Sequence, residues 1–283
     1  MKMIKDEDGQ VGIIGAILLI GVALMLLSVF VTYYVPDIVR RSEIAHLQET
    51  SESFLKIRDG VASQIQNKNV GSIYPVSLSI GEGGGSLLGI GNIAGSLSIN
   101  PSTSFYINST TDSIRANGSL VYEPAFSVLI HPQVSTYEWG GVVFRQGGRS
   151  IVKSGPIIDI RENVSSVIVN MSVVSLSSME MTSISGTITT SVNLYMDYIM
   201  PIKFYLSGQE EIGDIILDFN TPNAKAWRDY FESLFEDIGN EFYVFDPNLN
   251  TENRMVLRIK NVELNNSNFN FAIVRVSMGV TGG

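Results

Sequence analysis

The chain has 283 residues, enough for one large or two modest domains, and its 45% hydrophobic and only 17% charged residues favour a membrane or surface protein over an enzyme. A net charge of −9 argues against a nucleic-acid partner, because such binding needs a basic patch that displaces counterions from phosphates. The absence of cysteine excludes disulfide scaffolds, thiol nucleophiles, iron–sulfur clusters and cysteine zinc sites, and two histidines leave little for His-based chemistry.

An uncharged apolar run from Val11 to Val35 is the first predicted element. As a helix it would be about 37 Å long, which exceeds the hydrocarbon thickness of a bilayer of about 30 Å. Tyr33 and Tyr34 stand at its far end, where amphipathic rings favour the headgroup layer. The run therefore predicts a transmembrane helix.

The residues before this helix allow three interpretations. A secretory signal peptide needs a basic start and a small-residue cleavage site, whereas Asp6, Glu7 and Asp8 abut the apolar run here. A plain, uncleaved signal anchor is the second interpretation. The third rests on the short charged leader Lys5-Asp6-Glu7-Asp8, which ends in Gly9 before Gln10.

The third arrangement resembles the class III signal peptide of archaeal type IV pilins and archaellins. The resemblance implies that a prepilin-type peptidase cuts between Gly9 and Gln10, on the cytoplasmic side of the membrane. Bacterial pilins carry a Glu at the fifth mature position, where this chain has Ile14. Archaeal relatives commonly lack that Glu, so the departure weakens the bacterial analogy more than the archaeal one.

An amphipathic helix is predicted to follow the apolar one. Pro36 should kink the chain or end a segment, because it removes a backbone donor. From Asp37 to Gln66 the apolar stripe consists of Ile44, Leu47, Phe54, Val61 and Ile65, interrupted by Ser51 and Arg58. We expect the charged residues to take the other faces: Glu43, Glu49, Glu52, Lys56 and Asp59.

Small residues at four-residue spacing in the apolar helix would let helices approach closely: Gly12 and Ala16, and Ser28 and Thr32. We expect the helix to pack through them against other copies or stay in lipid. Five glycosylation sequons follow the helix, at Asn108, Asn117, Asn163, Asn170 and Asn265. Together with the polar, low-charge body they place residues 67–283 outside the cell.

The body reads as α+β, with a mainly antiparallel, sandwich-like or wrapped sheet and one late helix. Two long strands are expected at 187–198 and 164–176. The inward faces should be Ile188, Val192, Leu194, Met196 and Tyr198 on the first and Val167, Val169, Met171 and Val173 on the second. The glycine-rich stretch 81–92 lacks the Lys and the strand–loop–helix context of a phosphate loop.

The late helix is predicted from Thr221, as N-cap, to a stop at Gly239, and its aromatic stripe indicates core packing rather than a ligand site. The segment Ala226-Trp227-Arg228-Asp229-Tyr230-Phe231-Glu232, followed by a strand from Met255, resembles archaeal pilin-like membrane proteins with a β-rich domain of unknown function. Val121-Tyr122-Glu123 and 139–148 are also similar to that family. The resemblance implies a surface or pilus-like role and transfers no catalytic residue.

No catalytic or metal-binding constellation is expected, and no cofactor. His46 should be a solvated or docking residue and His131 a loop residue. The carboxylate pairs 210–211 and 236–237 should be solvated, and the oxygen-rich stretch 246–252 should be a turn rather than a calcium loop. The sequence thus predicts a leader at 1–9, a helix at 10–66 and a head at 67–283.

Two functions remain open. The first is a type IV pilin-like surface protein, a minor or accessory subunit assembled through its helix, with membrane lipid, the prepilin-type peptidase and other pilin-like subunits as partners and no nucleic acid. The second is an uncleaved, single-pass adhesion or binding protein with an extracellular head.

Overall fold

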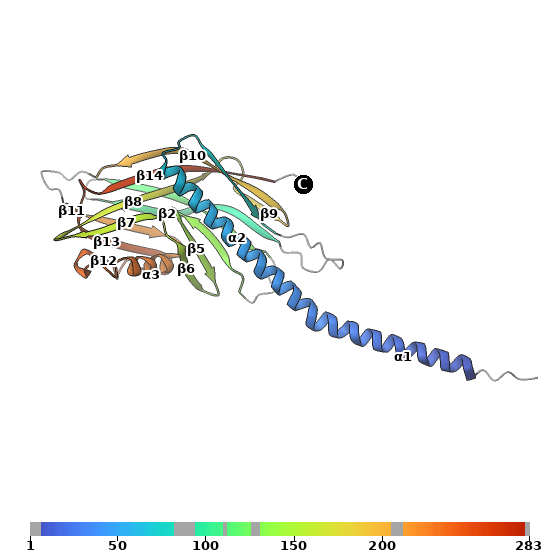
Figure 1. Ribbon diagram of the computed structural model, residues 1–283. Coiled ribbons are helices and arrows are strands. Elements are labelled where there is room, and N and C mark those ends of the chain that lie inside the picture. The colour runs from blue at the N-terminus through green and yellow to red at the C-terminus, as the bar shows by residue number, and fades with distance from the viewer. Residues whose placement is uncertain (1–6, 82–93, 110–111, 126–130, 205–211, 281–283) are drawn as a thin grey trace, which may run out of the picture.

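The computed structural model describes residues 7–81, 94–109, 112–125, 131–204 and 212–280. A long N-terminal helical rod, from Glu7 to Gln66, ends in a β-rich head that begins with the strand at Ile73 (Figure 1). The helical elements are α1 (Glu7–Val29), the π-helical turn η1 (Phe30–Tyr34), α2 (Val35–Gln66), α3 (Ala224–Leu234) and the 3-10 turn η2 (Asn240–Phe242). The predicted α+β class is confirmed.

The described part of the head contains fourteen strands in one hydrogen-bonded sheet. They are β1 (Ile73–Ser79), β2 (Gly95–Asn108), β3 (Ser113–Pro124), β4 (Val134–Glu138), β5 (Gly141–Gln146), β6 (Arg149–Ser154), β7 (Ile157–Asn163), β8 (Ser166–Ser178), β9 (Ser183–Gly186), β10 (Thr189–Ile202), β11 (Ile212–Asn220), β12 (Tyr243–Phe245), β13 (Arg254–Glu263) and β14 (Asn268–Val280).

The strand order is β1-β10-β14-β8-β13-β11-β2-β3-β4-β5-β6, with β12 on β13, β7 on β8 and β9 on β2. Pairing is antiparallel except where β8 lies parallel to β14 and β13. The sheet carries two hydrophobic clusters, one packed against α2 and one against α3. Burial of both clusters drives the wrapping of the sheet, because each amphipathic element must cover its apolar face.

The joint at Pro36 is a widened helical turn. Pro36 cannot donate a hydrogen bond, and its ring crowds the carbonyl four residues earlier. The chain responds with η1, where the Val35 N–H bonds to the carbonyl of Phe30, five residues back, and α2 then continues to Gln66. Figure 1 shows the helical rod changing direction between α1 and the docked part of α2. The helix ends at Gln66 as predicted.

Three details of the strands and the late helix differ from the sequence expectations. On β10, Val192, Leu194 and Met196 are buried, but the register with β14 shifts after Met196, and Tyr198 is exposed. One extra residue in a β-bulge reverses the facing of the residues after it. The late helix begins at Ala224 rather than after Thr221, and it ends at Leu234, before Gly239. The inward face predicted for β8, in contrast, is buried as expected.

Candidate functional site

The most conspicuous surface of the protein is the unpartnered apolar helix from Gly12 to Tyr34. Every residue in this segment is exposed. Among the described residues it is the one helix long and apolar enough to span a membrane. Large apolar patches of this kind mark membrane or protein interfaces, because soluble monomers rarely expose so much contiguous apolar surface to water. The segment is therefore suited to single-pass membrane anchoring.

The predicted helix-packing residues all lie on this exposed segment: Gly12, Ala16, Ser28 and Thr32. A methyl group built on Gly12 meets no atom within 4 Å, and the same is true at Gly21 on the opposite side of the helix. Gly9 and Gln10, the predicted cleavage pair, lie on the helical backbone of α1, which begins at Glu7.

The second half of the rod is fixed to the head. Its buried apolar residues are Leu47, Phe54, Ile57, Val61, Ala62 and Ile65, which pack mainly against β1, β10 and β4. The predicted stripe was interrupted at Arg58, but the neighbouring Ile57 is fully buried and fills that part of the stripe. Ile44, which was expected in the stripe, is 40% exposed. Gly60 lets the helix approach Tyr74 closely, since a methyl group there would lie 2.3 Å from the Tyr74 ring.

A buried polar cluster lies where α2 first reaches the head. Glu43 and His46 are both buried. The expectation that Glu43 faces solvent is therefore wrong, and of the two roles expected for His46, solvated or docking, the structure favours docking. His46 Nε2 is 2.9 Å from the hydroxyl of Tyr122, which donates to the carbonyl of Ile80 at 3.1 Å. Because that hydroxyl has one hydrogen, His46 Nε2 is the donor in the first bond. Burial raises the pKa of Tyr122 to about 12.

Three further hydrogen bonds, from two side chains of α2, fix the rod deeper in the head. Ser53 Oγ donates to the carbonyl of Ser77 on β1 at 3.2 Å. Arg58 donates from Nε and Nη2 to the carbonyl of Gly155, at 3.2 and 3.1 Å. Apolar burial and directional bonds together hold α2 against the head.

Glu138 is a buried acid that sequence reasoning missed. Its carboxylate accepts hydrogen bonds from Thr221 Oγ1 at 2.8 Å, Asn223 Nδ2 at 3.3 Å and Trp227 Nε1 at 2.6 Å. Burial nevertheless raises the pKa of Glu138, and these three bonds oppose that shift. The network ties the end of β4 to the start of α3, so its role is structural. Thr221 Oγ1 also accepts the N–H of Asn223 at 3.2 Å, in the turn that precedes α3.

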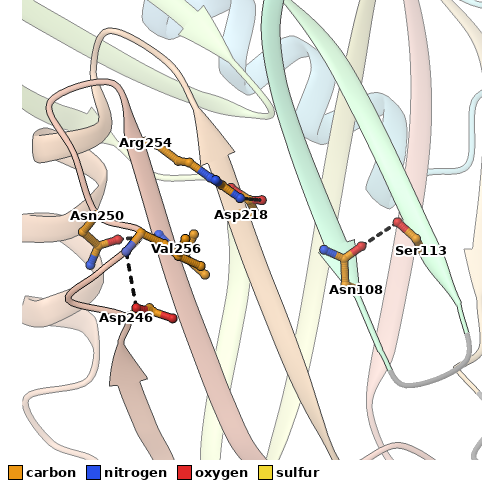
Figure 2. Close-up of polar contacts among 8 residues, drawn as sticks. Asn108, Ser113, Asp218, Asp246, Asn250, Arg254 and Val256 are labelled. Atoms are coloured by element: carbon orange, nitrogen blue, oxygen red, sulfur yellow. Dashed lines mark hydrogen bonds and ion pairs between the residues drawn. The ribbon is translucent and has the colours of Figure 1, made fainter.

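The five sequons occupy different environments. Asn108 ends β2, and Figure 2 shows its Oδ1 accepting a hydrogen bond from Ser113 on β3, at 2.5 Å. Asn117 and Asn170 lie within strands and are half-buried, whereas Asn163 and Asn265 lie exposed at turns. The sequons are therefore not equivalent in the folded head.

The oxygen-rich stretch 246–252 forms the predicted turn. Asp246 Oδ1 accepts the N–H groups of Asn248 and Leu249 at 2.9 and 3.3 Å, and Asn250 Oδ1 accepts that of Val256 at 2.6 Å. These bonds, partly visible in Figure 2, hold the backbone of the turn. The neighbouring Arg254 forms a bidentate pair with Asp218, at 3.0 and 2.8 Å.

The remaining polar candidates do not converge. His131 is exposed at a bend before β4, and Glu236 and Asp237 are solvated, as predicted. Glu210 and Glu211, and the glycine-rich stretch from 82 on, lie outside the described residues. Within those residues no three His, Asp or Glu side chains gather as a metal site requires. Comparison with protein-family models, with curated proteins and with solved structures gives no match.

Proposed function

We propose that this chain is an archaeal type IV pilin-like surface protein, a minor or accessory subunit whose apolar helix anchors it in the membrane or packs it into a filament. The observation that carries the proposal is one continuous rod whose first half is apolar and unpartnered and whose second half is fixed to a β-rich head. The rod presents the interface, and the head is held outside the cell. The protein acts by assembly rather than by turnover.

The leader supplies independent support. A short charged segment ends in Gly9 directly before Gln10 and the apolar run, the arrangement that resembles a class III signal peptide. Cleavage there would release the charged residues, so that an apolar helix beginning at Gln10 could enter a filament core. Burying those charges would otherwise be costly.

Blocking the cut tests this processing step. In Gly9→Leu, the purified protein should retain Met1, whereas Gly12→Leu should be processed like the wild type. If the wild type and Gly9→Leu are both full length, the protein is an uncleaved anchor and the alternative adhesion function takes precedence.

Assembly can be tested separately from processing. Replacing Gly12 or Ala16 by Leu adds bulk on one side of the helix and should reduce filaments, or complexes with other subunits, recovered from sheared cells. Val22→Leu is the matched control, because exposed Val22 lies between the face of Gly12 and Ala16 and the face of Ser28 and Thr32 on an ideal helix. Equal recovery of all three variants would contradict an interface through Gly12 and Ala16.

A further inference from the structure

The structure separates the described sequons by the accessibility of both residues that a glycosyltransferase reads, the Asn and the hydroxyl residue two positions on. Four sequons have all three residues described: those at Asn117, Asn163, Asn170 and Asn265. In three of them the hydroxyl residue is buried in the folded head, with exposed fractions of 0% at Ser119, 5% at Ser172 and 1% at Ser267.

The residues of the buried sequons are also part of the fold. The Asn117 N–H donates to Ser175 Oγ, and Ser175 Oγ donates back to the Asn117 carbonyl, which holds this part of β3 against β8. Ser267 Oγ accepts the N–H of Val169 at 3.0 Å. A transferase could read these sequons only after the head had opened locally.

Asn163 is different. It is the last residue of β7, in a tight turn to Ser166 on β8, and Asn163, Val164 and Ser165 are all exposed. Val164 is 98% exposed and has a φ of +22°, a conformation that β-branched residues rarely adopt. Figure 1 shows that β7 and β8 meet at the end of the head away from α1. The whole sequon is therefore presented to the surroundings without unfolding.

A carboxylate orders the acceptor side chain. Asn163 Nδ2 donates to Glu263 Oε1 at 2.6 Å, and Asn266 Nδ2 donates to Oε2 at 2.7 Å, while Ser166 Oγ also donates to Oε1. These hydrogen bonds hold the pKa of Glu263 below its usual value, so the carboxylate stays charged. An Asn amide nitrogen has two hydrogens, so the bond to Glu263 leaves one that can be replaced.

We propose that, among the four described sequons, Asn163 is the N-glycan acceptor of the folded head, and that Asn117, Asn170 and Asn265 are not modified once the head has folded. The co-substrate is a saccharide linked through its anomeric carbon to a lipid phosphate. A bond forms between Nδ2 and that carbon, and the bond from the carbon to the phosphate oxygen breaks. The lipid phosphate leaves with the electron pair, and the proton lost from Nδ2 passes to the solvent. The remaining Nδ2 hydrogen keeps the bond to Glu263.

The inference rests on the proposed placement of the head outside the cell, and the test is peptide mapping by mass spectrometry of the full chain purified from its native membrane. The peptide containing Asn163 should carry a saccharide mass. Asn163→Gln and Ser165→Ala should abolish that mass, and Ser165→Thr should retain it. Asn265→Gln, in a neighbouring exposed turn, is the matched control and should leave it unchanged. An unmodified Asn163, or saccharide on the other three sequons alone, would overturn the assignment.

An error in the proposed glycosylation of Asn163 can be distinguished from an error in the proposed location of the head outside the cell. The chain has no cysteine, so Val164→Cys in an Asn163→Gln background provides one exposed thiol in the same turn. A membrane-impermeant maleimide added to intact cells should label it. Labelling without saccharide on Asn163 in the wild type would overturn the glycan site and leave the surface location intact. Labelling only after lysis would overturn both.

Discussion

Removing the buried carboxylate of Glu138 should destabilise the head strongly. Glu138→Ala leaves three donors in the interior without an acceptor, on Thr221, Asn223 and Trp227. Each buried donor left unsatisfied costs about 1–3 kcal/mol. Allowing for partial relaxation, we expect a loss of about 4 kcal/mol, which for a domain of this size lowers the melting temperature by roughly 10 °C.

Thermal unfolding in a nonionic detergent can be followed by tryptophan fluorescence, because Trp139 and Trp227, the two tryptophans of the chain, are both buried. Glu236→Ala is the matched control: it removes an exposed carboxylate and should change stability by less than about 0.5 kcal/mol. A loss below about 1 kcal/mol for Glu138→Ala would refute the importance of the network.

Glu138→Gln tests the charge separately. The pKa of Glu138 is raised in the folded state above its ordinary value of 4.5, so the folded protein holds the proton more tightly than the unfolded chain. The stability that the wild type gains from holding this proton is fully present below pH 4.5, and it is lost as the pH rises through the folded-state pKa of Glu138. The wild type should therefore lose stability relative to Glu138→Gln as the pH rises. A relative gain over that range would contradict the raised pKa.

Three other variants probe the contact between α2 and the head, and the turn between β7 and β8, by the same unfolding measurement. Phe54→Ala removes a fully buried ring and should cost about 3–5 kcal/mol; a loss below about 1 kcal/mol would mean that α2 is not held as described. Gly60→Ala should destabilise by about 1–3 kcal/mol through the Tyr74 ring, and most of that cost should vanish in a Tyr74→Ala background. Val164→Gly relieves a positive φ without losing burial and should stabilise by about 1 kcal/mol; no gain would show that the turn is unstrained.

Local patterns were sufficient to predict much of the fold. The rod ends at Gln66 and the inward face of β8 is as expected, because helical and strand periodicities repeat over many residues and each mark one buried face. Departures occurred where a single residue breaks the repeat. Tyr198 continues the sequence alternation of β10, yet the bulge turns it outward, and nothing local indicates the bulge.

The polar interior was the part that could not be predicted. Glu138 and Glu43 look like solvated acids in the sequence, because acids are rarely fully buried without partners. The donors that satisfy Glu138 lie 83 to 89 residues away and meet it only when α3 docks on the sheet. The accessibility of each sequon was likewise invisible, since the motif is the same whether its hydroxyl residue lies in a strand or in a turn.

The most direct test of the proposed function is the mass of the N-terminal peptide of the protein isolated from its native membrane. A chain that begins at Gln10, in free or cyclised form, is the predicted result and would establish pilin-type processing. A chain that still begins at Met1 would contradict it and leave an anchored surface protein whose function lies in its head.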